Sequence, residues 1–292
     1  MADPVAVGIT SKVKTMSPSK ISTFEQCPKK FELSYIHGVR EPSGEAQVRG
    51  TLVHAALEAL FKAEPGERSE ELAFEELERY WYEEMAGDPD HQQAVAAIGE
   101  DAFLEAASKN LANYFGIEPI DEVRRVAVEG VERNVSVELT GLVEQDPELK
   151  VTLRGIIDRL DREADGSLTV VDYKTGKAPS PRFAEGKMPQ LYLYAAMVKA
   201  MTGELPARAK LYFLGQGATV VEAVVTAEKN NEQRRRANRT WKAVVDAFTA
   251  TREGRSDAFE AKPSKLCDWC YFSKPEFMEA HPYLRCPKYP GA

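Results

Sequence analysis

The sequence predicts an α/β fold, and three observations predict it. Apolar residues recur at helical spacing before residue 123 and again after residue 187. Between and beyond those segments, short runs rich in Val, Ile and Leu alternate with polar residues, as β-strands do. The 292 residues are 43% hydrophobic and 29% charged, which is ordinary for a globular protein with one large or two small domains.

The N-terminal part of the chain is predicted to be helical after a flexible tail of residues 1–16. Ser17 is suited to cap a helix and Pro18 to occupy its first position. This helix runs towards Cys27, and Pro28 begins a second one. Helical spacing then covers residues 49–63, 69–86 and 91–115.

The character of the chain changes at Val123, where strands become frequent. Strands are expected at residues 123–140, 151–161, 168–174, 210–214 and 220–226, and helices at residues 188–201 and 228–252. The segment after residue 262 is irregular and holds three of the four cysteines. We therefore divide the chain into a tail (1–16), N-terminal helices (17–63), an acidic helical region (64–122), a core (123–260) and a C-terminal segment (261–292).

Charge is distributed unevenly along the chain. The net charge is −8, yet residues 41–148 hold 26 acidic and 8 basic side chains, so the remainder carries about +10. The basic stretches are residues 12–40, 174–187 and 229–242, the last containing Arg234, Arg235 and Arg236. Such a surface can bind a polyanion even in an acidic protein. A solvated helix face explains the arginine run equally well.

Targeting signals and nucleotide motifs are not found in the sequence. No apolar run approaches the roughly 20 residues of a membrane span. The first 16 residues lack the apolar core of a signal peptide, so a cytoplasmic protein without a membrane partner is expected. Its four cysteines are then not expected to form disulfides. No GxxxxGK[ST] phosphate loop is present.

Residues 154–177 form the most informative segment, because two predicted strands flank a turn at Asp165-Gly166. A two-residue loop would place Asp158 and Asp172 on opposite faces. A three-residue loop, with Gly166 at the left-handed third position, places them directly opposite one another. We favour the three-residue loop, in which the two Cβ atoms lie roughly 4.5–5.5 Å apart.

Two opposed carboxylates in an apolar setting are unfavourable unless a cation lies between them. Lys174 lies on the same strand face as Asp172 and could position a water molecule. Mg²⁺ prefers such oxygen ligands. An exposed hairpin end with ordinary surface carboxylates fits the spacing as well. A structural role in packing likewise explains His54, near Glu58, as well as a role in catalysis does. The same holds for Gln190 and Tyr194, which lie one helical turn apart.

These residues together resemble a known family. His54, Gly155–Asp158 (G-I-I-D), Val171–Lys174 (V-D-Y-K) and Gln190–Tyr194 (Q-L-Y-L-Y) match, in order, the motifs of RecB-family nucleases of the PD-(D/E)XK superfamily. With Cys27 before these motifs and three cysteines after them, the chain resembles the iron–sulfur subgroup, which includes AddB-type nuclease domains and small CRISPR-associated exonucleases. The resemblance extends from about residue 17 to residue 288.

The resemblance implies a fold and a set of roles. The fold would be a restriction-endonuclease-like core, a mixed central sheet flanked by helices, with a helical insertion. His54, Asp158, Asp172 and the backbone carbonyl of Tyr173 would hold Mg²⁺ or Mn²⁺, and Lys174 would orient the attacking water. Gln190 and Tyr194 would hold DNA or support the metal ligands. Ile157 stands at the family's proline position, and Asp172 replaces its more usual Glu.

The four cysteines indicate a second inorganic group. Cys267-x-x-Cys270 with Cys27 and Cys286 could bind Zn²⁺ or an iron–sulfur cluster, since both accept four thiolates. The resemblance favours [4Fe–4S]. Because Cys27 and Cys267 are 240 residues apart, a shared cluster would join the N- and C-terminal segments. The fifteen residues between Cys270 and Cys286 exceed the gap expected of the subgroup.

The function predicted first is a metal-dependent DNA nuclease, an exonuclease on single-stranded DNA or DNA ends in repair, recombination or DNA processing. Lys177 and Arg234–Arg236 would contact phosphates. Two alternatives remain. One is a non-catalytic DNA-binding module or partner subunit of a helicase–nuclease complex, and the other is a zinc-stapled scaffold. The oligomeric state is left open.

Overall fold

The structure is a computed structural model that describes residues 13, 15–125, 131–139, 151–180, 182, 185–255, 257–284 and 286. Most of the predicted tail, at residues 1–12 and 14, lies outside the described residues. So do residues 126–130 and 140 of the predicted strand 123–140.

The chain divides into two compact units. Unit 1 comprises residues 1–41, 136–154 and 232–292, and unit 2 comprises residues 42–135 and 155–231. In the part of the chain that the structure describes, no helix is both long and apolar enough to cross a membrane.

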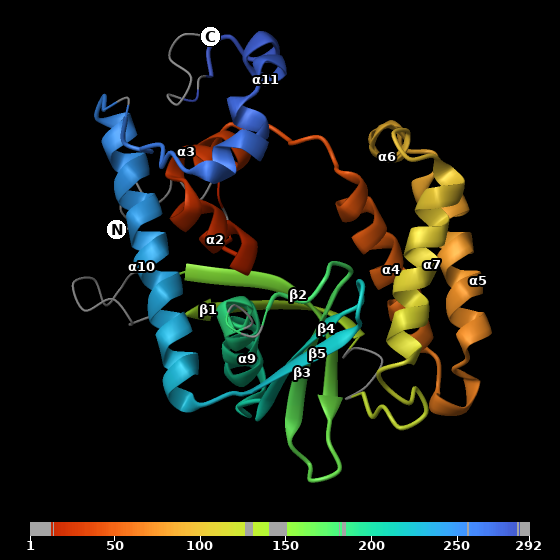
Figure 1. Cartoon of the computed structure of the whole chain (residues 1–292). Helices are drawn as coiled ribbons and strands as arrows, with labels where there is room; N and C mark the ends of the chain where they lie inside the picture. Colours follow the sequence, from red (N-terminus) through yellow and green to blue (C-terminus); the bar gives the residue numbers. More distant parts are fainter. Residues whose placement is uncertain are drawn as a thin grey trace. The chain divides into compact units, whose positions relative to one another are not determined.

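A five-stranded mixed sheet runs through the predicted core, as the α/β prediction required (Figure 1). The strand order is β1-β2-β3-β4-β5. β2 pairs antiparallel with β3, β3 parallel with β4, and β4 antiparallel with β5. The strands are β1 (Val131–Leu139), β2 (Val151–Arg162), β3 (Leu168–Lys174), β4 (Arg208–Phe213) and β5 (Thr219–Val224).

Helices of unit 2 cover both faces of β3 and β4. The helix α9 (Pro189–Thr202) packs on these strands and includes a continuous buried run from Leu191 to Val198. The buried cluster that contains Val171, Tyr173 and Tyr212 belongs to the other face. That cluster is completed by three helices that pack on one another (Figure 1), α4 (Glu45–Lys62), α5 (Glu70–Tyr80) and α7 (Glu100–Phe115).

The acidic helical region differs from its predicted form in one respect. Helical spacing across residues 91–115 resolves into two helices, α6 (Pro89–Val95) and α7. The break falls at Gly99, whose φ of +83° is a conformation that favours glycine. The predicted segment 69–86 is α5 followed by the π-helical turn Trp81–Met85. Another short turn, Pro65–Glu67, precedes α5.

Unit 1 contains the helices before residue 42 and most of the long helix α10 (Ala227–Arg252), whereas α4 belongs to unit 2. Ser17 caps α2 (Pro18–Gln26) with its side chain, as predicted. Phe24 contacts Phe31 and Phe259 edge-on, so aromatic rings join the start of the chain to the segment after α10. The remaining elements are α3 (Pro28–Phe31), the π-helical turn Glu32–Ile36, the 3₁₀ turns Lys265–Trp269 and Tyr271–Ser273, and α11 (Pro275–Ala280).

Candidate active site

The β2–β3 hairpin has the three-residue loop that the sequence favoured. The ladder runs from Arg162 opposite Leu168 to Arg159 opposite Val171, so Asp158 and Asp172 are the next pair in this register. Gly166 takes a φ of +86°, which is the left-handed position the loop needs. The hairpin therefore brings the two carboxylates to adjacent strands.

Lys174 and Asp172 form an ion pair on one face of β3. The Lys174 Nζ lies 2.5 Å from Asp172 Oδ2. Asp172 is 2% exposed, whereas the Lys174 side chain is more than a third exposed. Burial, and the nearby Asp158 carboxylate, raise the pKa of Asp172 to about 6, while Lys174 and His54 act in the opposite direction. The ammonium group thus offsets part of the cost of a buried carboxylate.

Tyr173 connects the two acids through its main chain. Its N–H donates to Asp158 Oδ2 at 2.6 Å, and its carbonyl oxygen lies 3.0 Å from His54 Nε2. His54 Nδ1 is 3.4 Å from the same Asp158 oxygen. The structure therefore gathers three predicted ligands, His54 of α4, Asp158 of β2 and the carbonyl of Tyr173 on β3, around the main chain of one residue.

Gln190 and Tyr194 lie on one face of α9, one turn apart, as their spacing predicted. Gln190 Nε2 donates to Asp172 Oδ1 at 3.0 Å and to the Tyr194 hydroxyl at 3.2 Å. The amide thereby fixes one oxygen of the Asp172 carboxylate. The geometry supports a role for Gln190 in orienting that carboxylate.

The donor set fits a hard divalent cation. It consists of two carboxylates, one carbonyl and one imidazole, and oxygen ligands are those that Mg²⁺ and Mn²⁺ prefer. Asp172 Oδ2 is buried, and its described partner is the ammonium group of Lys174. Among those same residues, no group of three or more His, Cys, Asp or Glu side chains is arranged to hold a metal ion.

A cavity of about 450 Å³ lies beside His54 and leads to solvent. Residues of α4 line it, together with Tyr80 and the half-exposed Ile156 of β2. Glu58, one turn beyond His54, is also in its wall. Of the candidate site residues, His54 is the one that lines this cavity.

The four cysteines surround one cavity in unit 1. All are half-buried and free of disulfides, and all four line a space of about 220 Å³. Ser273 holds the Cys267-x-x-Cys270 turn, because its hydroxyl donates to the carbonyls of both cysteines. Burial raises the pKa of the Cys270 thiol. The structure thus brings Cys27 and Cys286 to the same cavity as the C-x-x-C pair.

The predicted phosphate-binding residues are divided between the two units. Lys177 is exposed and follows β3 in unit 2, whereas Arg234, Arg235 and Arg236 lie on α10 in unit 1. Arg236 donates to both oxygens of Glu25 at 2.6–3.0 Å. Arg235 is exposed. The three arginines therefore differ in their surroundings, which the sequence did not indicate.

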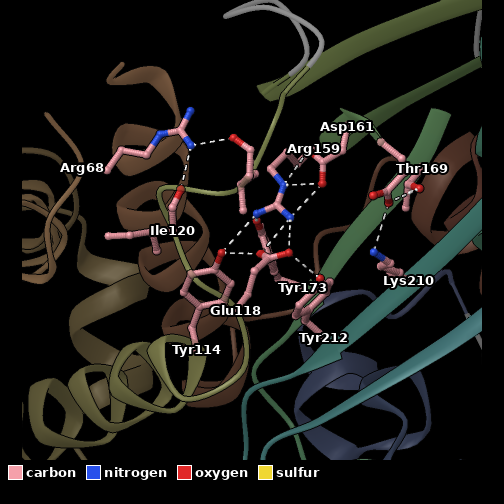
Figure 2. Close-up of polar contacts among 12 residues, drawn as sticks. Arg68, Tyr114, Glu118, Ile120, Arg159, Asp161, Thr169, Tyr173, Lys210 and Tyr212 are labelled. Carbon is pink, nitrogen blue, oxygen red and sulfur yellow. Dashed lines mark hydrogen bonds and ion pairs between the residues drawn. The ribbon is translucent and has the colours of Figure 1, made fainter. Parts of the chain in front are cut away.

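Sequence reasoning missed two groups of polar residues behind the site. Asn110 of α7 donates to the carbonyls of Thr175 and Leu214, which follow β3 and β4 directly. Arg159 is wholly buried among tyrosines and acids (Figure 2). A signal for Arg159 existed, because strand alternation places it and Asp161 together on the face opposite Asp158.

Comparisons with known proteins found a matching family and several similar chains. The family described as "PD-(D/E)XK nuclease superfamily" matches residues 15–274. A subunit of the ATP-dependent helicase/deoxyribonuclease of Streptococcus agalactiae serotype Ia is 28% identical over 188 residues, which are 61% of this chain and 16% of that protein. Its counterpart from Streptococcus equi subsp. zooepidemicus strain MGCS10565 is 25% identical over 197 residues, 63% of this chain and 16% of that protein.

A solved structure shares the fold. The crystal structure named "Putative exonuclease" from Eubacterium rectale superposes with a TM-score of 0.55 and 14% identity, and the match covers 94% of each chain. At that identity the likeness concerns the fold alone. The chain therefore spans nearly the whole of a solved relative but a small part of the helicase/deoxyribonuclease subunits.

Proposed function

The chain belongs to the PD-(D/E)XK nuclease superfamily, and from that premise we propose that it is a metal-dependent deoxyribonuclease, an exonuclease acting on single-stranded DNA or DNA ends. The observation that carries the proposal is the ion pair between Lys174 and the buried Asp172, beside Asp158 and His54. A lysine and two acids on adjacent strands are the groups that metal-assisted phosphodiester hydrolysis needs.

The proposed ligands of Mg²⁺ or Mn²⁺ are His54, Asp158, Asp172 and the Tyr173 carbonyl. When bound, such an ion supplies an activated water and neutralises charge on the phosphate. Lys174 orients the attacking water and stabilises negative charge that develops on the phosphoryl oxygens. Gln190, through its bond to Asp172, keeps that carboxylate turned towards the site.

The proposed DNA contacts are cations outside the site. Lys177 follows β3 by three residues and is exposed, as is Arg235 on α10, whereas Arg234 on the same helix is half-buried. Arg236, which was expected to act with them, has Glu25 as an ion-pair partner and contributes less to phosphate binding in this proposal. The helicase/deoxyribonuclease subunits among the relatives support a helicase as a partner.

We further propose that the cysteine cavity holds a [4Fe–4S] cluster, with Cys27, Cys267, Cys270 and Cys286 as ligands. Their presence around one cavity of about 220 Å³ supports the proposal. Four thiolates also suit Zn²⁺, so zinc is the alternative. Analysis of iron and acid-labile sulfide in protein purified without oxygen separates the two. We also propose a cytoplasmic location, because cysteines without disulfides are typical of a reducing compartment.

The test of the nuclease proposal is degradation of end-labelled single-stranded and duplex DNA with Mg²⁺ or Mn²⁺. Lys174→Ala is compared with Lys210→Ala, since Lys210 also pairs with an acid in unit 2, Glu163 at 3.1 Å. We expect the parent and Lys210→Ala to cleave and Lys174→Ala to be inactive. If a folded, iron-containing parent cleaves neither substrate, the non-catalytic DNA-binding module is favoured instead. Substrate shortening from one labelled end would give the polarity.

A further inference from the structure

Arg159 is a fully buried cation that the proposed chemistry does not use. It directly follows Asp158 on β2, and strand alternation turns the two side chains to opposite faces. A lone guanidinium in the interior would be very unfavourable, so its partners must be complete. The contacts of this side chain therefore indicate what it does.

Every nitrogen of the Arg159 guanidinium has a described acceptor (Figure 2). Nε donates to both oxygens of Asp161 at 2.9 and 3.0 Å. Nη2 donates to both oxygens of Glu118 at 3.0 and 2.9 Å. Nη1 donates to the hydroxyls of Tyr173 at 2.9 Å and Tyr114 at 3.2 Å. The ring of Phe61 lies 4.3 Å from the guanidinium carbon.

Glu118 is the second centre of this network. It lies after α7, in the acidic helical region, and its carboxylate also accepts from the Tyr114 hydroxyl at 2.6 Å and the Tyr212 hydroxyl at 2.7 Å. The charge of Arg159 is therefore balanced by a residue 41 positions earlier in the chain. Arg159, Glu118 and the three tyrosines each bond to a partner from another element, whereas Asp161 bonds to Arg159 of its own strand.

Tyr173 is the member that reaches the candidate active site. Its hydroxyl accepts from Arg159 on one face of the sheet, while its main chain bonds to Asp158 and lies against His54. Its two neighbours in sequence are Asp172 and Lys174. A rotation or shift of Tyr173 would consequently displace every candidate ligand on β3.

We infer that Glu118 and Arg159 are positioning residues, which hold Tyr173 so that its main chain fixes the geometry of the metal ligands. This inference rests on the proposed nuclease site. It assigns the acidic helical region a role in the chemistry, because Glu118 comes from that region. Outer contacts of this kind typically change metal affinity or activity about 10–100-fold when they are removed.

The test compares matched pairs of variants. Tyr173→Phe and Tyr212→Phe each remove one hydroxyl from the network, but only Tyr173 carries main-chain contacts to the candidate ligands. Glu118→Gln is paired with Arg68→Met. Arg68 is also a buried cation of unit 2, and its described hydrogen bonds go to the main-chain carbonyls of Ala63, Ile120 and Val123. Figure 2 shows the bond to Ile120. Tyr173→Phe decides the test if Glu118→Gln fails to fold.

Three quantities are measured for each variant: unfolding by denaturant, Mn²⁺ affinity by electron paramagnetic resonance titration without DNA, and cleavage rate against Mn²⁺ concentration. Tyr173→Phe and Glu118→Gln should weaken Mn²⁺ binding about 10-fold and recover much of their rate at saturating Mn²⁺. Tyr212→Phe and Arg68→Met should stay within about 2-fold of the parent in Mn²⁺ affinity, whatever they lose in stability.

Two results would overturn the inference. The first is unchanged Mn²⁺ affinity in Tyr173→Phe. The second is a loss of Mn²⁺ affinity in Arg68→Met as large as that in Tyr173→Phe. The network would then stabilise the fold in general and would not position the metal ligands. Suppose that the parent binds Mn²⁺ and cleaves DNA, and that Tyr173→Phe has the same Mn²⁺ affinity and cleavage rate. The positioning role is then rejected, and the proposed nuclease function stands. A parent that binds no Mn²⁺ rejects the metal site and the positioning role together.

Discussion

Gly155 and Tyr194 touch so closely that no other residue fits at position 155 without a shift. A Cβ on Gly155 would lie 2.6 Å from Cε1 of the Tyr194 ring, well inside normal contact. The Tyr194 hydroxyl accepts a hydrogen bond from the Gln190 amide, which also donates to the Asp172 carboxylate. The first residue of the G-I-I-D segment is thus a packing partner of the Q-x-x-x-Y pair on α9.

Gly155→Ala should therefore impair catalysis more than folding. Displacing Tyr194 would move Gln190 and, through it, Asp172, so we expect a loss of about 10–100-fold in kcat. Overpacking should cost about 1–3 kcal/mol in the free energy of unfolding. Gly66→Ala is the control, since a Cβ there meets nothing within 4 Å. Full activity in Gly155→Ala would mean that a displacement of Tyr194 does not affect catalysis.

Asp172→Asn should stabilise the metal-free protein at pH 8 while abolishing activity. Because burial raises the pKa of Asp172 from 3.8 to about 6, the native state binds this proton more tightly than the unfolded state. The contribution of Asp172 to the free energy of unfolding therefore falls as pH rises from about 4 to about 6. Above that range the buried Asp172 carboxylate is charged and destabilises the native state. Removing it should raise the free energy of unfolding by about 1–3 kcal/mol.

The measurement is chemical denaturation at pH 5 and pH 8 without divalent cations. Asp165→Asn is the control on the same hairpin, because hydrogen bonds from Ser167 lower the pKa of this exposed carboxyl. Asp165→Asn should give no gain at pH 8. A gain of equal size in both variants would point to net charge as the cause.

Cys267→Ser should lose iron and loosen unit 1 without changing the metal chemistry of unit 2. We expect faster amide hydrogen exchange in residues 17–41 and 261–284, because a cluster shared by distant cysteines restrains both segments. Mn²⁺ affinity at the candidate active site should remain that of the parent. Asp158→Asn is the converse control and should keep its iron. Stoichiometric zinc without labile sulfide in the parent would contradict the cluster.

Arg235→Ala and Arg236→Ala should have different effects. Arg235 is exposed, so its loss should lower the slope of log Kd against log salt for single-stranded DNA by about 1. Arg236 pairs with Glu25, and Thr240 donates to the same carboxylate at 2.9 Å. Its loss should reduce stability, and Glu25→Gln should do the same. If the salt dependence of DNA binding is unchanged in Arg235→Ala, the proposed contact between Arg235 of α10 and the DNA is wrong.

The sequence predicted those parts of the site that depend on local geometry. The register opposing Asp158 and Asp172 follows from the position of Gly166 in the loop. Gln190 and Tyr194 share a face because residues four apart on a helix do so. These relations depend on a few neighbouring residues, so the sequence alone indicates them.

The parts that the sequence did not predict depend on long-range pairing. Arg159 meets Glu118, and Arg236 meets Glu25, which is 211 positions away. A basic run on a helix gives no sign that one member has an acid partner from the N-terminus. Likewise, the two helices that replace the single segment 91–115 depend on the backbone of Gly99, which apolar spacing does not register.

The contacts of Asn110 and Glu118 have a practical consequence for anyone who wishes to shorten this chain into a minimal enzyme. Residues 64–122 look removable, because they are acidic, helical and separate from every catalytic motif. Deleting them would leave the carbonyls of Thr175 and Leu214 without the amide of Asn110, and the guanidinium of Arg159 without one of its two carboxylate partners. A compact derivative would have to retain α7 and the turn after it.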